Sequence, residues 1–302
     1  MFPKVKLLNV RSSLTAMDAV DNCPNIHCNE KLPLSGIQCP VCTEFIGRPN
    51  VRRAMAEQQD LQSRYESSLT SVKLRGVLSI AKAFEKEVTN SNAVMARNFK
   101  QLTIMFDDDN LLLSTFNQQV ASNARMADSN KFDESRESFE SKIYPYDFQD
   151  IHYAALSLND IGLSYYGNCH IKFNTKLIRN RASVFEENPC IFLTRHNITG
   201  HMPLPKGYRA TWNERGKLAL SKLHAKITKE TSKTDFQDIL VYENQKEQST
   251  SDCIEVHIHG KIHIKIFEKI TLIGELNTVD NALYNVYEPL LKQQGILLGR
   301  MS

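Results

Sequence analysis

The segment CIEVHIHG, residues 253–260, combines one carboxylate with two imidazoles at alternate positions. Because successive side chains of a β-strand point to opposite faces, we expect Glu255, His257 and His259 on one face. A carboxylate in that setting can stabilise a developing positive charge or act as a general base. Alternatively, the imidazoles of His257, His259 and His263 form a metal face, as in a metal-dependent phosphoesterase, or are simply strand histidines.

A second group of reactive side chains consists of four cysteines near the N-terminus: Cys23, Cys28, Cys39 and Cys42. The CPVC pair has the two-residue spacing that lets two thiolates converge on one ion, and zinc is the natural occupant. The first pair, CPNIHC, is spaced more widely, and His27 is an alternative ligand. Four ligands would close a tetrahedral site, so we expect a structural zinc and not a catalytic one.

Composition divides the chain into three regions that would have to position these side chains. Residues 1–50 hold the cysteines among Pro, Asn and Gly, and we predict a zinc-binding segment. Residues 51–142 contain almost no Gly or Pro, and this composition predicts a helical region. Its apolar residues recur at helical spacing, for instance at Leu69, Val72, Val77, Ile80, Phe84 and Val88. Residues 143–302 form the third region, so the predicted fold class is α+β.

The third region alternates between apolar and polar residues in several short runs, which predicts a mixed β-sheet. The expected strands are 153–158, 170–173, 190–194, 236–242, 254–258 and 262–266. A helix over 210–231 is expected to interrupt them. The polar segment 243–252 lies just before the strand that carries Glu255, and a loop in that place is a candidate contact for a substrate protein.

Four motifs of the third region together resemble a bacterial domain family of unassigned function that is related to mono-ADP-ribosyltransferases. They are Tyr-Ala-Ala-Leu at 153–156, Tyr-Gly-Asn-Cys-His at 166–170, Arg-Ala-Ser at 181–183 and Glu-Val-His-Ile-His-Gly at 255–260. The resemblance covers about residues 150–274, and its last two motifs are the most specific. It implies an ADP-ribosyltransferase-like domain of the toxin or effector type, behind an N-terminal zinc-binding segment.

The resemblance also implies the roles of particular residues. Glu255, Ser183 and His257 would be catalytic, and NAD would be held by His152, Tyr153, Tyr165, Tyr166, Gly167 and Arg181. The nicotinamide–ribose bond of NAD is glycosidic, so its cleavage builds positive charge on the ribose, and a carboxylate is needed to face that charge. The expected activity is transfer of ADP-ribose from NAD to a protein side chain, with arginine as the expected acceptor.

Departures from the family pattern support a second hypothesis. The first strand has His152 where an arginine is expected, His257 replaces a glutamine, and the Gly-Asp-Ser ending is missing after Ser183. These losses fit a catalytically inactive, transferase-like binding module stapled by zinc.

Charge and hydropathy limit the partners. The formal net charge is +3, from 37 basic and 34 acidic residues, so nucleic acid is not an expected partner. No apolar stretch reaches membrane-spanning length, and no secretory signal is evident. We expect synthesis in a bacterial cytoplasm, with NAD and a target protein as partners, and with secretion or translocation into a host cell as the route to that target.

Overall fold

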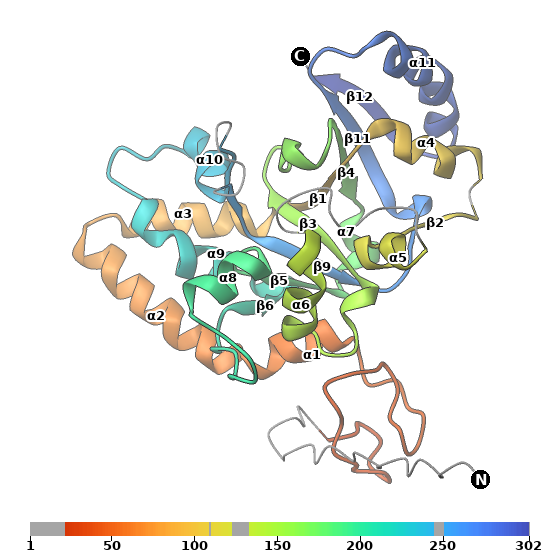
Figure 1. Ribbon diagram of the computed structural model, residues 1–302. Coiled ribbons are helices and arrows are strands. Elements are labelled where there is room, and N and C mark those ends of the chain that lie inside the picture. The colour runs from red at the N-terminus through yellow and green to blue at the C-terminus, as the bar shows by residue number, and fades with distance from the viewer. Residues whose placement is uncertain (1–21, 109, 123–132, 245–250, 302) are drawn as a thin grey trace, which may run out of the picture.

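The computed structural model describes residues 22–108, 110–122, 133–244 and 251–301, and its main feature is an eight-stranded sheet (Figure 1). The strand order is β12-β11-β4-β1-β3-β9-β5-β6, and all neighbours are antiparallel except β11 and β12. The strands are β1 (Asn92–Arg97), β3 (Ile151–Ser157), β4 (Cys169–Phe173), β5 (Ala182–Phe185), β6 (Arg209–Thr211), β9 (Glu255–His259), β11 (Phe267–Ile273) and β12 (Leu297–Met301).

The described part of the chain also contains two short strand pairs and eleven α-helices. Strand β2 (Leu112–Leu113) pairs with β10 (Ile262–His263), and β7 (Val241–Tyr242) pairs with β8 (Asp252–Cys253). The helices are α1 (Pro49–Ala56), α2 (Gln58–Leu74), α3 (Leu78–Thr89), α4 (Phe99–Asp107), α5 (Phe116–Ala121), α6 (Asp133–Ile143), α7 (Thr175–Ile178), α8 (Pro189–Arg195), α9 (Arg215–Leu223), α10 (Phe236–Leu240) and α11 (Thr278–Gln293).

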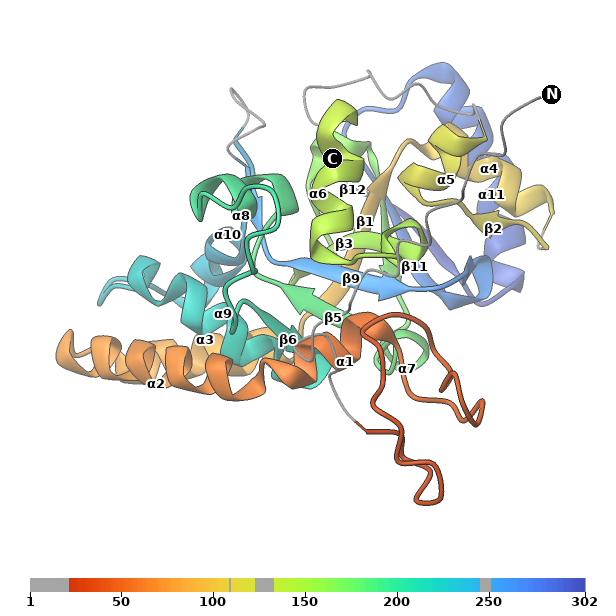
Figure 2. The ribbon, with the colours of Figure 1, turned by 60° about the horizontal axis from the view of Figure 1, so that its bottom comes forward.

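Strand β9 separates two cores, because its side chains alternate between the faces of the sheet. Val256 and Ile258 belong to the large core that also holds side chains of α2, α3 and α9. Glu255 and His257 point the other way, where Tyr144 and Phe185 belong to a smaller core. Figure 2 shows α2, α3 and α9 on one side of β9, with α6 and α8 on the other. The functional residues expected on one face of β9 therefore lie between the sheet and α6.

The region predicted as helical, 51–142, differs from that prediction in one important respect. Helices α2 and α3 confirm the helical spacing, but β1 follows them and lies in the interior of the large sheet, between β4 and β3. Four consecutive residues of β1 are buried. A short apolar run of this length fits a helix or a strand equally well, and its pairing partners decide between them. The large core thus contains side chains from both sides of residue 142.

Four local predictions are wrong in whole or in part. Of the strand expected over 262–266, only Ile262–His263 is a strand, and a 3-10 helix follows over Ile264–Ile266. Residues 190–194 lie in α8 because Asn188 caps the helix, accepting a hydrogen bond from the Cys190 N–H, and Pro189 occupies its first turn. Most of 236–242 forms α10, whose Phe236 and Leu240 are buried one helical turn apart. The helix expected over 210–231 is shorter, since α9 is preceded by β6.

The coarse fold prediction is confirmed: the chain is a mixed α/β protein with a large mixed sheet and a cysteine cluster near its N-terminus. Strands β3, β4 and β9 lie where the alternating patterns predicted them, whereas β5 was not among the predicted strands. Among the helices that the structure describes, none is long and apolar enough to span a membrane.

Candidate functional site

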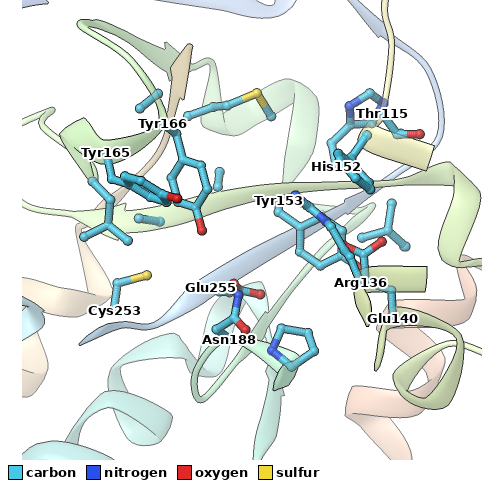
Figure 3. Close-up of a pocket in the computed structure, with 18 of the residues that line it drawn as sticks. Thr115, Arg136, Glu140, His152, Tyr153, Tyr165, Tyr166, Asn188, Cys253 and Glu255 are labelled. Carbon is cyan, nitrogen blue, oxygen red and sulfur yellow. Dashed lines mark hydrogen bonds and ion pairs between the residues drawn. The ribbon is translucent and has the colours of Figure 1, made fainter. Parts of the chain in front are cut away.

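A pocket of about 960 Å³, measured out to its open mouth, lies over β1, β3 and β9. Its other walls come from α5, α6, the segment before β4 and the first turn of α8. Figure 3 shows Glu255 beside Asn188, with Arg136 and Glu140 on one side and Tyr165 and Tyr166 on the other.

Glu255 is the central charged group of the pocket. Only 8% of the residue is exposed, and its carboxylate has a partner on each oxygen. Oε2 lies 2.8 Å from Nε2 of His257, and Oε1 accepts a hydrogen bond of 3.2 Å from the Asn188 side-chain amide. The carboxylate is therefore held in one orientation while it faces the pocket, which is the arrangement needed to stabilise a cation or to accept a proton.

His257 lies behind Glu255 and is completely buried. Its Nδ1 is 2.6 Å from the Tyr144 hydroxyl, and the rings of Tyr144, Tyr153 and Phe185 surround its imidazole at 4.8–5.5 Å between centroids. Burial lowers the pKa of His257, although Glu255 opposes the shift, so the imidazole is neutral. Burial also raises the pKa of Tyr144, which keeps its proton. Tyr144 thus donates to Nδ1, and Nε2–H donates to Glu255.

Helix α6 contributes a second charged pair to the pocket. The Arg136 guanidinium is ion-paired with Glu140 one helical turn along, and Glu140 also accepts a hydrogen bond of 2.6 Å from the Asn117 amide. Arg136 lies over the rings of Phe116, at 4.5 Å, and Tyr153, at 5.3 Å. Burial raises the pKa of Glu140, and the charge of Glu255 adds to the shift. The pocket lining therefore includes two carboxylates, Glu140 and Glu255, and two arginines, Arg97 and Arg136.

Three tyrosines predicted from the sequence line the pocket. Tyr165 and Tyr166 stand together, with 5.1 Å between ring centroids, and 43% of Tyr166 is exposed. The Tyr153 hydroxyl is buried and has no hydrogen-bond partner among the described residues. Two ring faces and one unpartnered hydroxyl are thus available to a planar ligand with polar edges.

His152 also lines the pocket, as predicted, but as a neutral group. It is almost fully buried, and its Nδ1 has no partner among the described residues. Burial lowers the pKa of His152 to about 3, and the nearby charges of Arg97 and Arg181 act in the same direction. At neutral pH it can offer a hydrogen bond to a ligand but not a positive charge.

Four of the predicted residues do not line the pocket: His257, which lies behind Glu255, and Ser183, Arg181 and Gly167. Ser183 is fully buried on β5, opposite His257. Arg181 lies at the far end of β9, where its Nη1 donates to the carbonyl oxygens of His259, at 3.3 Å, and Lys261, at 2.7 Å. Gly167 has a φ of +140°, and a Cβ there would lie 2.1 Å from the carbonyl carbon of Arg97. Its glycine is explained by the close approach of the two backbones.

The four predicted metal ligands do converge. The sulfur atoms of Cys23, Cys28, Cys39 and Cys42 all lie within 4.8 Å of one another, with separations of 3.4 Å for Cys23–Cys42 and 3.7 Å for Cys28–Cys39. A tetrahedral zinc ion bonded to sulfur at about 2.3 Å places its ligands roughly 3.8 Å apart. His27 is exposed and lies outside this group. The donor set can hold a metal such as zinc, and all four thiols are free of disulfides.

The surroundings of Cys39 favour the thiolate that a metal requires. Backbone N–H groups of Cys42 and Val41 lower the pKa of the Cys39 thiol to about 7. Burial has the opposite effect at Cys23 and raises the pKa of that thiol to about 12. Zinc would supply the charge that deprotonates the remaining thiols and would close the segment into its loops.

Two further predictions concern residues near the pocket. The histidines at 257, 259 and 263 form no metal-binding group within the described part of the chain, and His263 instead accepts a hydrogen bond from the Lys265 N–H. The proposed substrate-contact loop lies largely outside the described residues, which omit 245–250. Its first residue, Glu243, accepts a hydrogen bond from the Tyr165 N–H and so lies beside the pocket.

Several residues in the pocket or directly behind it were missed in the sequence. Arg136 and Glu140, which line the pocket, are spaced by four residues on one face of α6, and Tyr144 follows at the same spacing directly after the helix. That spacing was the available signal in a stretch that reads as a polar linker. Asn188 precedes a proline, a pattern typical of a helix start, and its amide reaches Glu255 because α8 begins there.

Comparison of the chain with protein-family models and with curated proteins finds no match.

Proposed function

We propose that the chain transfers ADP-ribose from NAD to a protein side chain and releases nicotinamide, with Glu255 as the catalytic carboxylate. The observation that carries the proposal is the placement of Glu255. It faces the open pocket, while His257 and Asn188 each donate a hydrogen bond to one of its oxygens and fix its orientation. The motif resemblance and the tyrosine-lined walls support the same substrate.

The chemistry follows from the polarity of the bond that breaks. The bonding electrons leave with nicotinamide, and positive charge develops on the ribose carbon and ring oxygen. The Glu255 carboxylate stabilises that charge and then accepts the proton of the attacking side chain as its bond to the ribose forms. Tyr165 and Tyr166 offer ring faces to nicotinamide, and the unpartnered hydroxyl of Tyr153 offers it a hydrogen bond.

Residues 22–48, which carry the four cysteines and are called the cysteine segment below, have a separate role in this proposal: they select the target protein. The two loop tips of this segment carry apolar side chains that face solvent: Ile26 is 85% exposed, and Val41 is 66% exposed. Apolar residues at the tips of a metal-closed loop are well placed to contact a partner. Zinc there would supply rigidity and no part of the transfer chemistry.

The second candidate is a transferase-like binding module without activity, and one observation favours it. Arg136, a prominent cation of the pocket, is already paired with Glu140 and so is poorly placed to bind the diphosphate of NAD. Calorimetry of the zinc-loaded protein separates the two candidates. NAD binding supports the transferase, and a folded protein that binds no NAD supports the binding module.

The direct test compares the unmodified protein with Glu255→Gln, using labelled NAD and a mixed cell lysate. We expect labelled protein and free nicotinamide from the unmodified chain only, with a loss of at least about 100-fold in the variant. Glu268→Gln is the matched control, because Glu268 lies on β11, pairs with Lys172 and is outside the pocket. Full activity in Glu255→Gln would remove Glu255 from the mechanism.

A further inference from the structure

Asn50 is a fully buried polar side chain that has no part in the proposed chemistry. Its Nδ2 lies 3.1 Å from the Arg181 carbonyl oxygen, 3.1 Å from the Ser183 hydroxyl and 2.8 Å from the His257 carbonyl oxygen. One amide from α1 thus joins the paired strands β5 and β9 on the side of the sheet that carries Glu255. Buried groups of this kind require partners, since each bond left unmade costs free energy.

We infer that Asn50 is a positioning residue for Glu255 and that the cysteine segment holds Asn50 in place. The inference rests on the proposed function only where it concerns activity; the orientation of Glu255 is a separate, measurable property. It depends on the buried hydrogen bonds that meet at His257 and on the contacts between the cysteine segment and α1.

The hydrogen bonds around His257 link Asn50 to Glu255 in two steps. Asn50 donates to the His257 carbonyl oxygen at 2.8 Å and so fixes the backbone of β9 at that residue. Tyr144 donates to Nδ1 of the same residue, and Nε2–H of His257 donates to Glu255. Buried networks of this kind have a stronger effect than their separate bonds.

The position of His257 determines how well its ring nitrogens meet their two partners. If Asn50 is lost, the His257 carbonyl oxygen loses its side-chain donor and the backbone of β9 can shift, which weakens the bond between Tyr144 and Nδ1. His257 can then take the other tautomer in part, in which Nε2 is unprotonated and faces the Glu255 carboxylate with a lone pair. The carboxylate would turn away from that contact. A displacement of about 1 Å at a reacting group can lower a rate by roughly 100-fold.

The cysteine segment holds α1 through Arg52, which is 4% exposed and lies one helical turn beyond the helix N-cap. Its guanidinium donates to the carbonyl oxygens of Pro33 at 2.7 Å, Ser35 at 3.1 Å and Gly36 at 3.0 Å. These three residues lie between the two cysteine pairs. Closing the cysteine cluster therefore orders the carbonyl groups that hold Arg52, and α1 carries Asn50 on the same short helix.

The test observes His257 directly by ¹⁵N NMR of histidine-labelled protein, with its signals assigned through His257→Asn. In the unmodified, zinc-loaded protein we expect the Nε2–H tautomer. Asn50→Ala and Tyr144→Phe should each shift both ring nitrogens toward a mixture of tautomers. Because both act through one set of bonds, the double variant should shift them no further than Tyr144→Phe alone. Unchanged His257 signals in Asn50→Ala, or additive shifts in the double variant, would overturn the inference.

Metal removal tests the role of the cysteine segment in the same spectrum. A chelator, or Arg52→Ala if Asn50→Ala does not fold, should shift the His257 signals in the same direction as Asn50→Ala, and restored zinc should reverse the effect of the chelator. His27→Ala is the matched control and should leave the signals unchanged. If zinc removal leaves His257 unaltered, the segment does not hold Asn50.

Activity adds an independent measurement. Asn50→Ala should lower the turnover of NAD by about 10- to 100-fold while KM changes little, because the side chain positions Glu255 and does not touch the substrate. If the unmodified protein has no activity toward NAD, the proposed function fails. The NMR result still decides whether Asn50 positions Glu255.

Discussion

Glu140 and Glu255 reach the same pocket from different elements, one from α6 and the other from β9, and the charge of Glu255 acts on Glu140. Burial is the main cause of the raised pKa of Glu140, and the Glu255 carboxylate adds to it. We therefore predict that Glu255→Gln lowers the pKa of Glu140, toward its ordinary value. Titration of the Glu140 side chain by carbon-detected NMR measures this shift, and an unchanged value would mean that the two carboxylates are not coupled.

Tyr144→Phe should distinguish the contribution of the Tyr144 hydroxyl to stability from that of its ring. The ring packs in the smaller core and is retained, so the free energy of unfolding should fall by only about 1–3 kcal/mol, the cost of leaving His257 Nδ1 without its donor. Urea unfolding measures the change. Phe185→Leu is the comparison, since it removes a ring contact with His257 and leaves the hydrogen bond; the two variants should then differ in the His257 signals.

His152→Leu should change how stability depends on pH. The pKa of His152 is about 3 in the folded chain, well below its ordinary value of 6.5, so the unfolded chain binds the proton more readily. This histidine therefore destabilises the fold as pH falls from about 6.5 toward 3, by up to about 1.4 kcal/mol per pH unit. The unfolding free energy of His152→Leu, measured across that range, should fall less steeply. Parallel pH curves for the two proteins would contradict the prediction.

Gly167→Ala should be strongly destabilising. A Cβ at Gly167 would lie 2.1 Å from the Arg97 carbonyl carbon, and the φ of +140° is unfavourable for other residues. The combined cost is about 3 kcal/mol or more. Gly295→Ala is the matched control: its φ is +78° and its Cβ would meet no atom within 4 Å, so it should cost only about 1–2 kcal/mol. Equal losses by urea unfolding would rule out the clash.

The cysteine cluster should hold one zinc ion per chain. Elemental analysis should find this ion in the unmodified protein and in His27→Ala, but not in Cys39→Ser. Without the metal, residues 22–48 lose the ligand set that closes their loops, and we expect proteolytic cleavage there first. Retention of stoichiometric zinc by Cys39→Ser would exclude the four-thiolate site.

The sequence predicted the strands of the site better than the helices around it. Strands β3 and β9 are buried on both faces but carry different residues on each face, so the alternation of residue types along the sequence could be recognised. Helix α8 was taken for a strand because its residues, CIFLT, favour strands, and its capping by Asn188 decided the outcome. Strand β1 has no local signal that distinguishes it from a helix, and its partners lie more than 50 residues away.

Site prediction followed the same division. Glu255, Tyr153 and the paired tyrosines could be placed because each lies on a motif with its own spacing. Asn50 could not, since it reaches His257 across 207 positions of the chain and no local pattern encodes that contact. Arg181 was predicted to line the pocket because it belongs to the Arg-Ala-Ser motif of the resemblance. Its guanidinium instead binds carbonyl groups at the far end of β9.

The place of β1 limits how the chain can be divided. This strand precedes residue 142, yet it pairs with β3 on one edge and β4 on the other. A fragment beginning at residue 143 would keep all four motifs of the resemblance. It would lose β1, the strand that joins the two halves of the large sheet. It would expose two unpaired edges, which are sites of aggregation. The half of the chain that carries these motifs is therefore not a portable module and must be expressed together with the residues that precede it.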